Sequence, residues 1–117
     1  KVKRININVP LTFRIHPSME KQITLSQHEV TAHTVDISST GIGLITNLYI
    51  PAGAILSIQI ARNIFYPKET VEDKYVQLTG EVTSARMEEG KYRLGILLKE
   101  LSEENRIAIK KIMESTT

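Results

Sequence analysis

The 117-residue chain contains no cysteine. It therefore has neither a disulfide framework nor a thiolate metal site, which agrees with a reducing compartment such as the cytosol. No apolar run approaches the roughly 20 residues that a transmembrane helix needs, and no charged-then-apolar leader opens the chain. These absences predict no direct membrane insertion and give no indication of secretion.

An excess of charge of one sign is also missing. Fifteen lysines and arginines stand against 13 acidic residues, for a net charge of +2. Proteins that bind DNA or RNA usually carry a clear basic stripe, so nucleic acid is not an expected partner. Locally, Lys1, Lys3 and Arg4 form a basic opening that either faces a small anion or is a solvated chain end. Because the chain opens on Lys1 and not on methionine, we expect it to be a piece of a longer protein.

Metal-binding and catalytic patterns are absent from the sequence as well. His28 and His33 are five residues apart on a predicted strand and would face opposite ways, and His16 stands alone. No chelating pair is visible, so no metal site is predicted. The chain also has no nucleophile elbow, phosphate-binding loop or H-E-x-x-H pattern. We expect a binding module without a cofactor, not an enzyme.

The alternation of apolar and polar residues at period two dominates what is present. Leu11, Phe13 and Ile15 form the apolar face of a first predicted strand. Later strands are predicted at residues 29–37 and 42–46, around Leu56, Ile58 and Ile60, around Val76, Leu78 and Val82 with a bend or bulge at Gly80, and around Tyr92, Leu94, Ile96 and Leu98. A chain of this length with 41% hydrophobic residues fits one domain. The pattern predicts an all-β fold, a small antiparallel barrel of six or seven strands, because closure removes exposed edges.

Only the C-terminal part has a helical pattern. Ser102 is suited to the N-cap, Glu103 and Glu104 to the positive end of the helix dipole, and Lys110 and Lys111 to the negative end. The apolar stripe consists of Ala108, Ile109, Ile112 and Met113. One C-terminal helix over about residues 102–114 is therefore predicted to dock on the barrel.

Residues 36–41 read Asp-Ile-Ser-Ser-Thr-Gly and run directly into an apolar stretch. Asp36 and Ser38 are two apart on an extended segment and so point to the same face, while Gly41 lets the backbone turn and approach a ligand closely. A structural interpretation also stands: in a strand turn, Asp and Ser bond nearby backbone and the glycine takes a positive φ.

Together with residues 3–10 (Lys-Arg-Ile-Asn-Ile-Asn-Val-Pro) and residues 92–96 (Tyr-Arg-Leu-Gly-Ile), this segment resembles the PilZ domain family. Its members typically bind the bacterial second messenger cyclic di-GMP. Asp36, Ser38 and Gly41 match the family's D/N-x-S-x-x-G signature in full. The other signature, R-x-x-x-R before an apolar residue and proline, places its first arginine on Arg4 and its second on Asn8. Half of the arginine clamp is therefore missing.

The resemblance implies a cytoplasmic cyclic di-GMP receptor with a flexible N-terminal switch at residues 1–10 and a PilZ-like barrel domain at residues 11–117. An arginine fork grips phosphate or the guanine edge, and a carboxylate accepts from the guanine amino and imino groups. Ligand would order the switch and re-aim an adjacent domain of a longer chain or a protein target. The ligand-binding residues that the resemblance implies are Arg4, Asn8, Asp36, Ser38 and Gly41, with Lys3 lending charge.

Asn8 separates two functional hypotheses. A charge-assisted hydrogen bond contributes roughly 1.5 to 3 kcal/mol, and each 1.4 kcal/mol is about tenfold in affinity. Losing one arginine would weaken the site by about ten- to more than a hundredfold, although the Asn8 amide still offers a donor and an acceptor. The alternative is a PilZ-like protein-interaction adaptor that binds cyclic di-GMP weakly or not at all.

Overall fold

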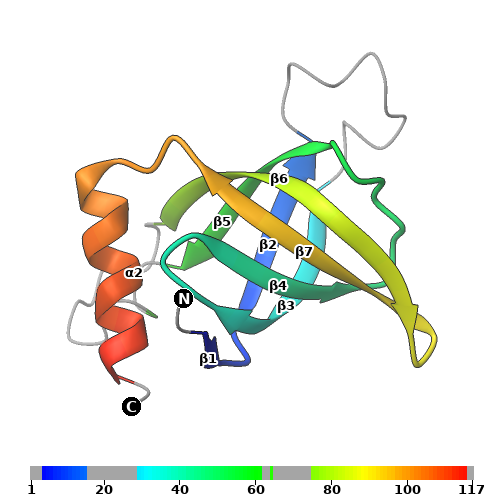
Figure 1. Ribbon diagram of the computed structural model, residues 1–117, viewed down its shortest axis with the longest axis horizontal. Coiled ribbons are helices and arrows are strands. Elements are labelled where there is room, and N and C mark those ends of the chain that lie inside the picture. The colour runs from blue at the N-terminus through cyan, green and yellow to red at the C-terminus, as the bar shows by residue number, and fades with distance from the viewer. Residues whose placement is uncertain (1–3, 16–28, 62–63, 65–74, 116–117) are drawn as a thin grey trace.

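The computed structural model describes residues 4–15, 29–61, 64 and 75–115, which form seven strands and one helix (Figure 1). In chain order these elements are β1 (Ile5–Asn6), β2 (Pro10–Ile15), β3 (Val30–Ile37), β4 (Gly41–Thr46), β5 (Ile55–Ala61), β6 (Tyr75–Glu88), β7 (Lys91–Lys99) and α2 (Glu103–Ser115). Within the described part of the chain, no helix is long and apolar enough to cross a membrane.

Six of the strands close into an antiparallel barrel. The sheet order is β3-β2-β5-β6-β7-β4, and β4 pairs back with β3 to complete the ring. The extra strand, β1, lies beside β3, where Ile5 pairs with Ile37, and β2 continues along the same edge, where Pro10 pairs with His33. The predicted fold class, a small antiparallel barrel with one C-terminal helix, is confirmed.

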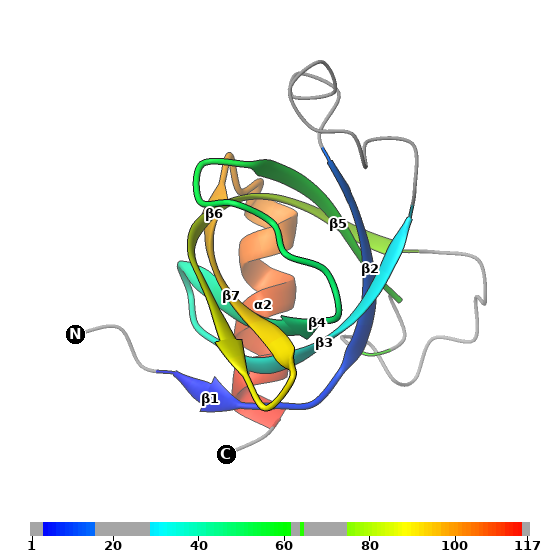
Figure 2. The same ribbon diagram turned by 90° about the vertical axis from the view of Figure 1, so that its right-hand side faces the viewer.

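The period-two pattern places apolar side chains inside the barrel, as predicted. Leu11, Phe13 and Ile15 of β2 are all at most 3% exposed. Equivalent buried positions on the other strands are Leu56, Ile58, Ile60, Val76, Leu78, Val82, Leu94, Ile96 and Leu98. In the view along the barrel in Figure 2, α2 lies across the far end. That end is therefore covered by the helix, whose Ala108, Ile109 and Ile112 are buried.

Gly80 has a different structural role from the predicted one. The register of β6 against β7 shifts between Val82 and Ser84, so the bulge lies there and not at Gly80. A Cβ at Gly80 would lie 2.3 Å from Cγ2 of Ile96. Glycine is needed at this position because the strands of the barrel pack too closely for a side chain.

The start of α2 agrees with the predicted cap. The backbone N–H of Asn105 donates to Oγ of Ser102 at 3.1 Å, the bond expected of an N-cap serine. Glu103 and Glu104 occupy the first turn as expected. Lys110 and Lys111 lie before the last turn, which contains no basic residue, so their predicted place at the negative end of the dipole is wrong.

Candidate functional site

A β-bulge in β3 turns the side chain of Asp36 to the outside of the barrel. Thr34 pairs with Leu44 and Ile37 pairs with Ile42, both of which are core positions, whereas Asp36 pairs with Gly43. Since strand residues two apart normally share a face, Asp36 would point into the core with Thr34 if the strand were regular. The extra residue of the bulge reverses this and places a carboxylate on the outer surface.

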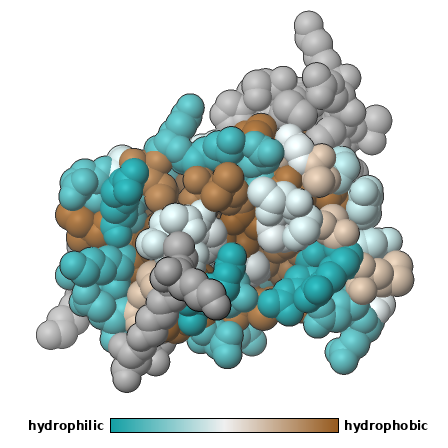
Figure 3. All heavy atoms as spheres, viewed as in Figure 1, coloured by the Kyte–Doolittle hydropathy of each residue, from teal (hydrophilic) through white to brown (hydrophobic). Residues whose placement is uncertain are grey.

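Glycines open a groove beside Asp36. Gly43 of β4 pairs with Gly95 of β7, so two adjacent strands lack side chains at the same level. A Cβ at Gly43 would lie 2.7 Å from Oδ1 of Asp36. The resulting groove has a volume of about 390 Å³ and is lined by Arg4, Asp36, Arg93 and both glycines among others. Figure 3 shows the same face of the molecule as Figure 1. Over the strands, hydrophilic side chains (teal) surround side chains of intermediate (white) and apolar (brown) character.

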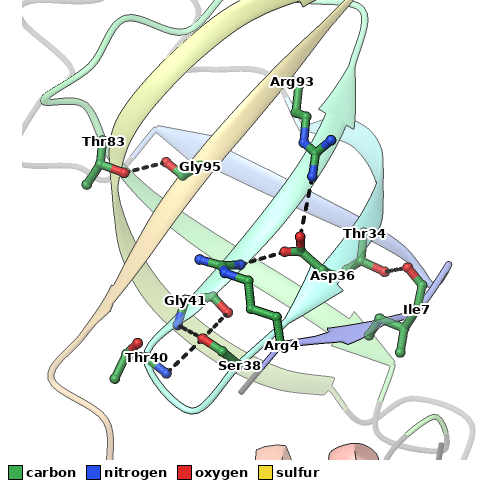
Figure 4. Close-up of polar contacts among 10 residues, drawn as sticks. All are labelled: Arg4, Ile7, Thr34, Asp36, Ser38, Thr40, Gly41, Thr83, Arg93 and Gly95. Atoms are coloured by element: carbon green, nitrogen blue, oxygen red, sulfur yellow. Dashed lines mark hydrogen bonds and ion pairs between the residues drawn. The ribbon is translucent and has the colours of Figure 1, made fainter. Parts of the chain in front are cut away.

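Two arginines hold the Asp36 carboxylate (Figure 4). Arg4 donates from Nη1 to Oδ1 at 2.6 Å, and Arg93 donates from Nη2 to Oδ2 at 3.4 Å. The Asp36 side chain is 12% exposed, while those of Arg4 and Arg93 are 53% and 29% exposed. The carboxylate is therefore largely enclosed between cations that themselves reach solvent, an arrangement suited to binding an anion at the groove.

Arg93 was not among the site residues expected from the sequence. It lies on β7, 57 positions after Asp36, and β4 lies between β7 and β3 in the sheet. The strand pattern did place Arg93 on the polar face of its strand, opposite the buried Leu94 side. The sequence contains no information on which outer-face arginine would reach Asp36, because that depends on strand order.

The Ser38 hydroxyl forms its hydrogen bonds within the turn between β3 and β4. Its hydroxyl accepts from the N–H groups of Gly41 at 3.0 Å and Thr40 at 3.3 Å, and donates to the Gly41 carbonyl at 3.4 Å. The residue is fully buried. These contacts agree with the structural interpretation, in which Ser38 shapes the turn between β3 and β4. Contact between Ser38 and a ligand stays a prediction.

Gly41 is extended in β4 and does not take the positive φ that the turn interpretation required. A Cβ here would lie 2.8 Å from the carbonyl oxygen of Ile96 and 3.4 Å from Nη2 of Arg4. The position therefore needs glycine because β7 and Arg4 approach it closely. The close approach to a ligand that the sequence suggested stays a prediction. Gly41 allows Arg4 to lie against the barrel wall.

Thr34 of β3 forms hydrogen bonds with the N-terminal segment, here residues 4–9. Its Oγ1 accepts from the N–H of Val9 at 2.8 Å and donates to the carbonyl of Ile7 at 3.2 Å, while its own N–H donates to the Val9 carbonyl at 2.9 Å. Asn8, between these anchored residues, is exposed and lines a separate hollow with His33. The structure thus brings Arg4 and Asp36 together and places Asn8 outside their groove. Flexibility of residues 1–10 stays a prediction, and Lys3 lies outside the described residues.

A metal centre is not found in the described ranges, which contain no group of three or more His, Cys, Asp or Glu side chains able to hold an ion. His33 is described and exposed on β3, whereas His16 and His28 lie outside these ranges. The groove at Asp36 is lined by the side chains of Arg4, Arg86 and Arg93.

The chain belongs to the PilZ domain family, as its sequence predicted. The family model, described as PilZ domain, matches residues 8–115. The match begins at Asn8, so Arg4 and Lys3 precede it. The curated proteins give no match by sequence.

Solved structures, PilZ domains among them, share this fold. MotI/DgrA, the inhibitor of motility of Bacillus subtilis, is 12% identical with a TM-score of 0.69, over 98% of this chain and 49% of that one. The PilZ domain of YcgR from Escherichia coli, solved with c-di-GMP, is 12% identical with a TM-score of 0.68, over 99% and 89% of the two chains. The PilZ domain of CeSA from a cellulose-synthesizing bacterium is 12% identical with a TM-score of 0.61, over 97% and 96%. The chain spans about half the length of MotI/DgrA, and this level of identity shows the fold alone.

Proposed function

We propose that this domain is a cytoplasmic receptor for cyclic di-GMP. The observation that carries the proposal is the contact between Arg4 and Asp36 at 2.6 Å, because it joins the two signatures of the family on one groove. Cyclic di-GMP carries two phosphate charges and two guanines. Arginine supplies bidentate donors for either group, and a carboxylate supplies the acceptor for the guanine edge.

Signal relay would pass through the N-terminal segment. β1 is only two residues long, and Arg4 directly precedes it. Such a short strand adds little stability of its own. A ligand that binds Arg4 would therefore shift the equilibrium between the undocked and docked N-terminal segment towards the docked state. In a longer protein, docking would change the direction in which a preceding domain or a bound partner is held. Asn8, Ser38, Gly41 and Lys3 would support the ligand or the corner that holds it.

The proposal is tested by calorimetric titration of cyclic di-GMP into the domain, with GTP as a competitor. Asp36→Ala is expected to abolish binding. Glu81→Ala is the matched control, because Glu81 is also an acidic residue in an ion pair, 2.8 Å from Lys99, and does not line the groove. Micromolar binding that survives in the control and is lost in Asp36→Ala supports the receptor. Equal binding by wild type and Asp36→Ala contradicts it.

Asn8 favours a second candidate, a protein-interaction adaptor with weak or no affinity for the nucleotide. The position of the second clamp arginine is occupied by a neutral residue that lies outside the Arg4 groove. No binding of cyclic di-GMP up to millimolar concentration would favour this alternative over the receptor.

A further inference from the structure

We propose that Arg93, assisted by Arg86, takes the place of the missing second clamp arginine and binds a phosphate of cyclic di-GMP. This assignment rests on the proposed function. It makes the clamp of this chain from one arginine of the N-terminal segment and one from β7, instead of two from the N-terminal segment.

The first support is the position of the Arg93 guanidinium. It contacts Oδ2 of Asp36 at 3.4 Å, while Arg4 contacts Oδ1 of the same carboxylate. Arg93 comes from β7 and reaches β3 across β4, and this path is open because Gly43 and Gly95 have no side chains. The two guanidinium groups therefore flank one carboxylate from opposite sides of the groove.

The second support is an unfavourable pair on the outer face. Arg86 of β6 and Arg93 of β7 are directly opposite one another in the register. Like charges at such positions destabilise a sheet. Glu88 offsets part of the repulsion, with contacts of 3.5 Å to Arg86 and 3.8 Å to Arg93. A phosphate bound between Arg86 and Arg93 would offset the remaining repulsion. The pair of arginines therefore favours the binding of an anion.

The third support is the donor capacity of Arg93. A guanidinium has five N–H donors, more than its contacts with Asp36 and Glu88 use. Its side chain is 29% exposed and lines the groove. Asn8, by contrast, lines the neighbouring hollow. Among the described residues, Arg93 is thus better placed than Asn8 to contact a ligand held by Arg4.

The test is calorimetric titration of cyclic di-GMP into wild type, Arg4→Ala, Arg93→Ala and Arg14→Ala, each checked for folding by circular dichroism. Arg14 is the matched control, since it is an exposed arginine paired with Glu29 at 3.4 Å and away from the groove. Arg93→Ala is expected to weaken binding by about ten- to a hundredfold, as the loss of a charge-assisted contact does. Arg14→Ala is expected to bind like wild type.

Two further measurements separate ligand contact from mere positioning of Asp36. If Arg93 contacts phosphate, the salt dependence of the affinity is shallower in Arg93→Ala than in wild type. The double variant Asn8→Arg/Arg93→Ala is expected to recover most of the lost affinity, because an arginine at the usual clamp position then takes over. Recovery would also show that the Arg93→Ala fold is intact.

The outcomes distinguish this assignment from the proposed function. If wild type binds and only Arg4→Ala loses affinity, the receptor stands and the role of Arg93 is wrong. The role is also wrong if Arg93→Ala weakens binding with an unchanged salt dependence and no recovery by Asn8→Arg. If wild type does not bind up to millimolar ligand, both proposals fail together.

Discussion

Replacing Asp36 by alanine is expected to destabilise the unliganded domain, and to do so more than the loss of an ordinary surface ion pair. The Asp36 side chain is 12% exposed and has two arginine partners. Without it, the remaining ion pair of Arg93 among the described residues is the 3.8 Å contact with Glu88, and Arg93 still faces Arg86 across the strands. The change therefore removes two attractions and leaves the repulsion between Arg86 and Arg93 offset only in part, by Glu88.

The size of the effect follows from burial. Exposed ion pairs contribute about 0.2 to 1 kcal/mol, and charge-assisted bonds in less solvated places about 1.5 to 3 kcal/mol. Since Arg4 is 53% exposed and the Arg93 contact is 3.4 Å long, we expect the contribution of each contact to lie nearer the range of exposed ion pairs. We expect Asp36→Ala to lower the free energy of unfolding by about 1 to 2 kcal/mol, which in a domain of this size lowers Tm by about 3 to 10 °C.

The assay is thermal and urea unfolding followed by far-UV circular dichroism without ligand. Glu81→Ala, which breaks the 2.8 Å pair with Lys99, is the reference for a partly exposed bridge and is expected to cost about 0 to 1 kcal/mol. A double-mutant cycle of Asp36→Ala with Arg93→Ala isolates their coupling. The reasoning is refuted if Asp36→Ala unfolds at the same temperature as wild type, or if it costs no more than Glu81→Ala.

Three other changes give independent tests. Asn8→Arg is expected to tighten cyclic di-GMP binding by about tenfold or more, and a calorimetric titration without any gain would mean that position 8 is not the clamp position. Gly80→Ala is expected to lower the free energy of unfolding in urea by about 1 to 3 kcal/mol, because the new Cβ would lie 2.3 Å from Cγ2 of Ile96 in the core; a neutral result would show that the strands can separate to admit a methyl group. Thr34→Val keeps the shape but leaves the Val9 N–H without its 2.8 Å acceptor, so hydrogen exchange at the Val9 amide is expected to accelerate at a stability cost of about 1 to 2 kcal/mol; unchanged exchange would show that Thr34 does not hold the segment.

Part of the site could be predicted because its residues are close in the sequence. Asp36, Ser38 and Gly41 share one strand end, so their common corner follows from local geometry. The backbone contacts of Ser38 follow one of the two interpretations that the sequence offered. The reason for glycine at position 41 could not be predicted, because it is the close Ile96 carbonyl of another strand.

The sequence predicted the six strands of the barrel, the C-terminal helix and the family, since these depend on the period of apolar residues, a serine cap and short motifs. The two-residue strand β1 was not predicted. The orientation of Asp36 and the side chains that reach it from other strands depend on the tertiary structure. One inserted residue in β3 turns Asp36 outward, and the register places Gly43 and Gly95 side by side beneath it. Strand order then brings Arg93 to a carboxylate 57 positions away. Such placement depends on the closure of the whole barrel, which no local pattern of residues encodes.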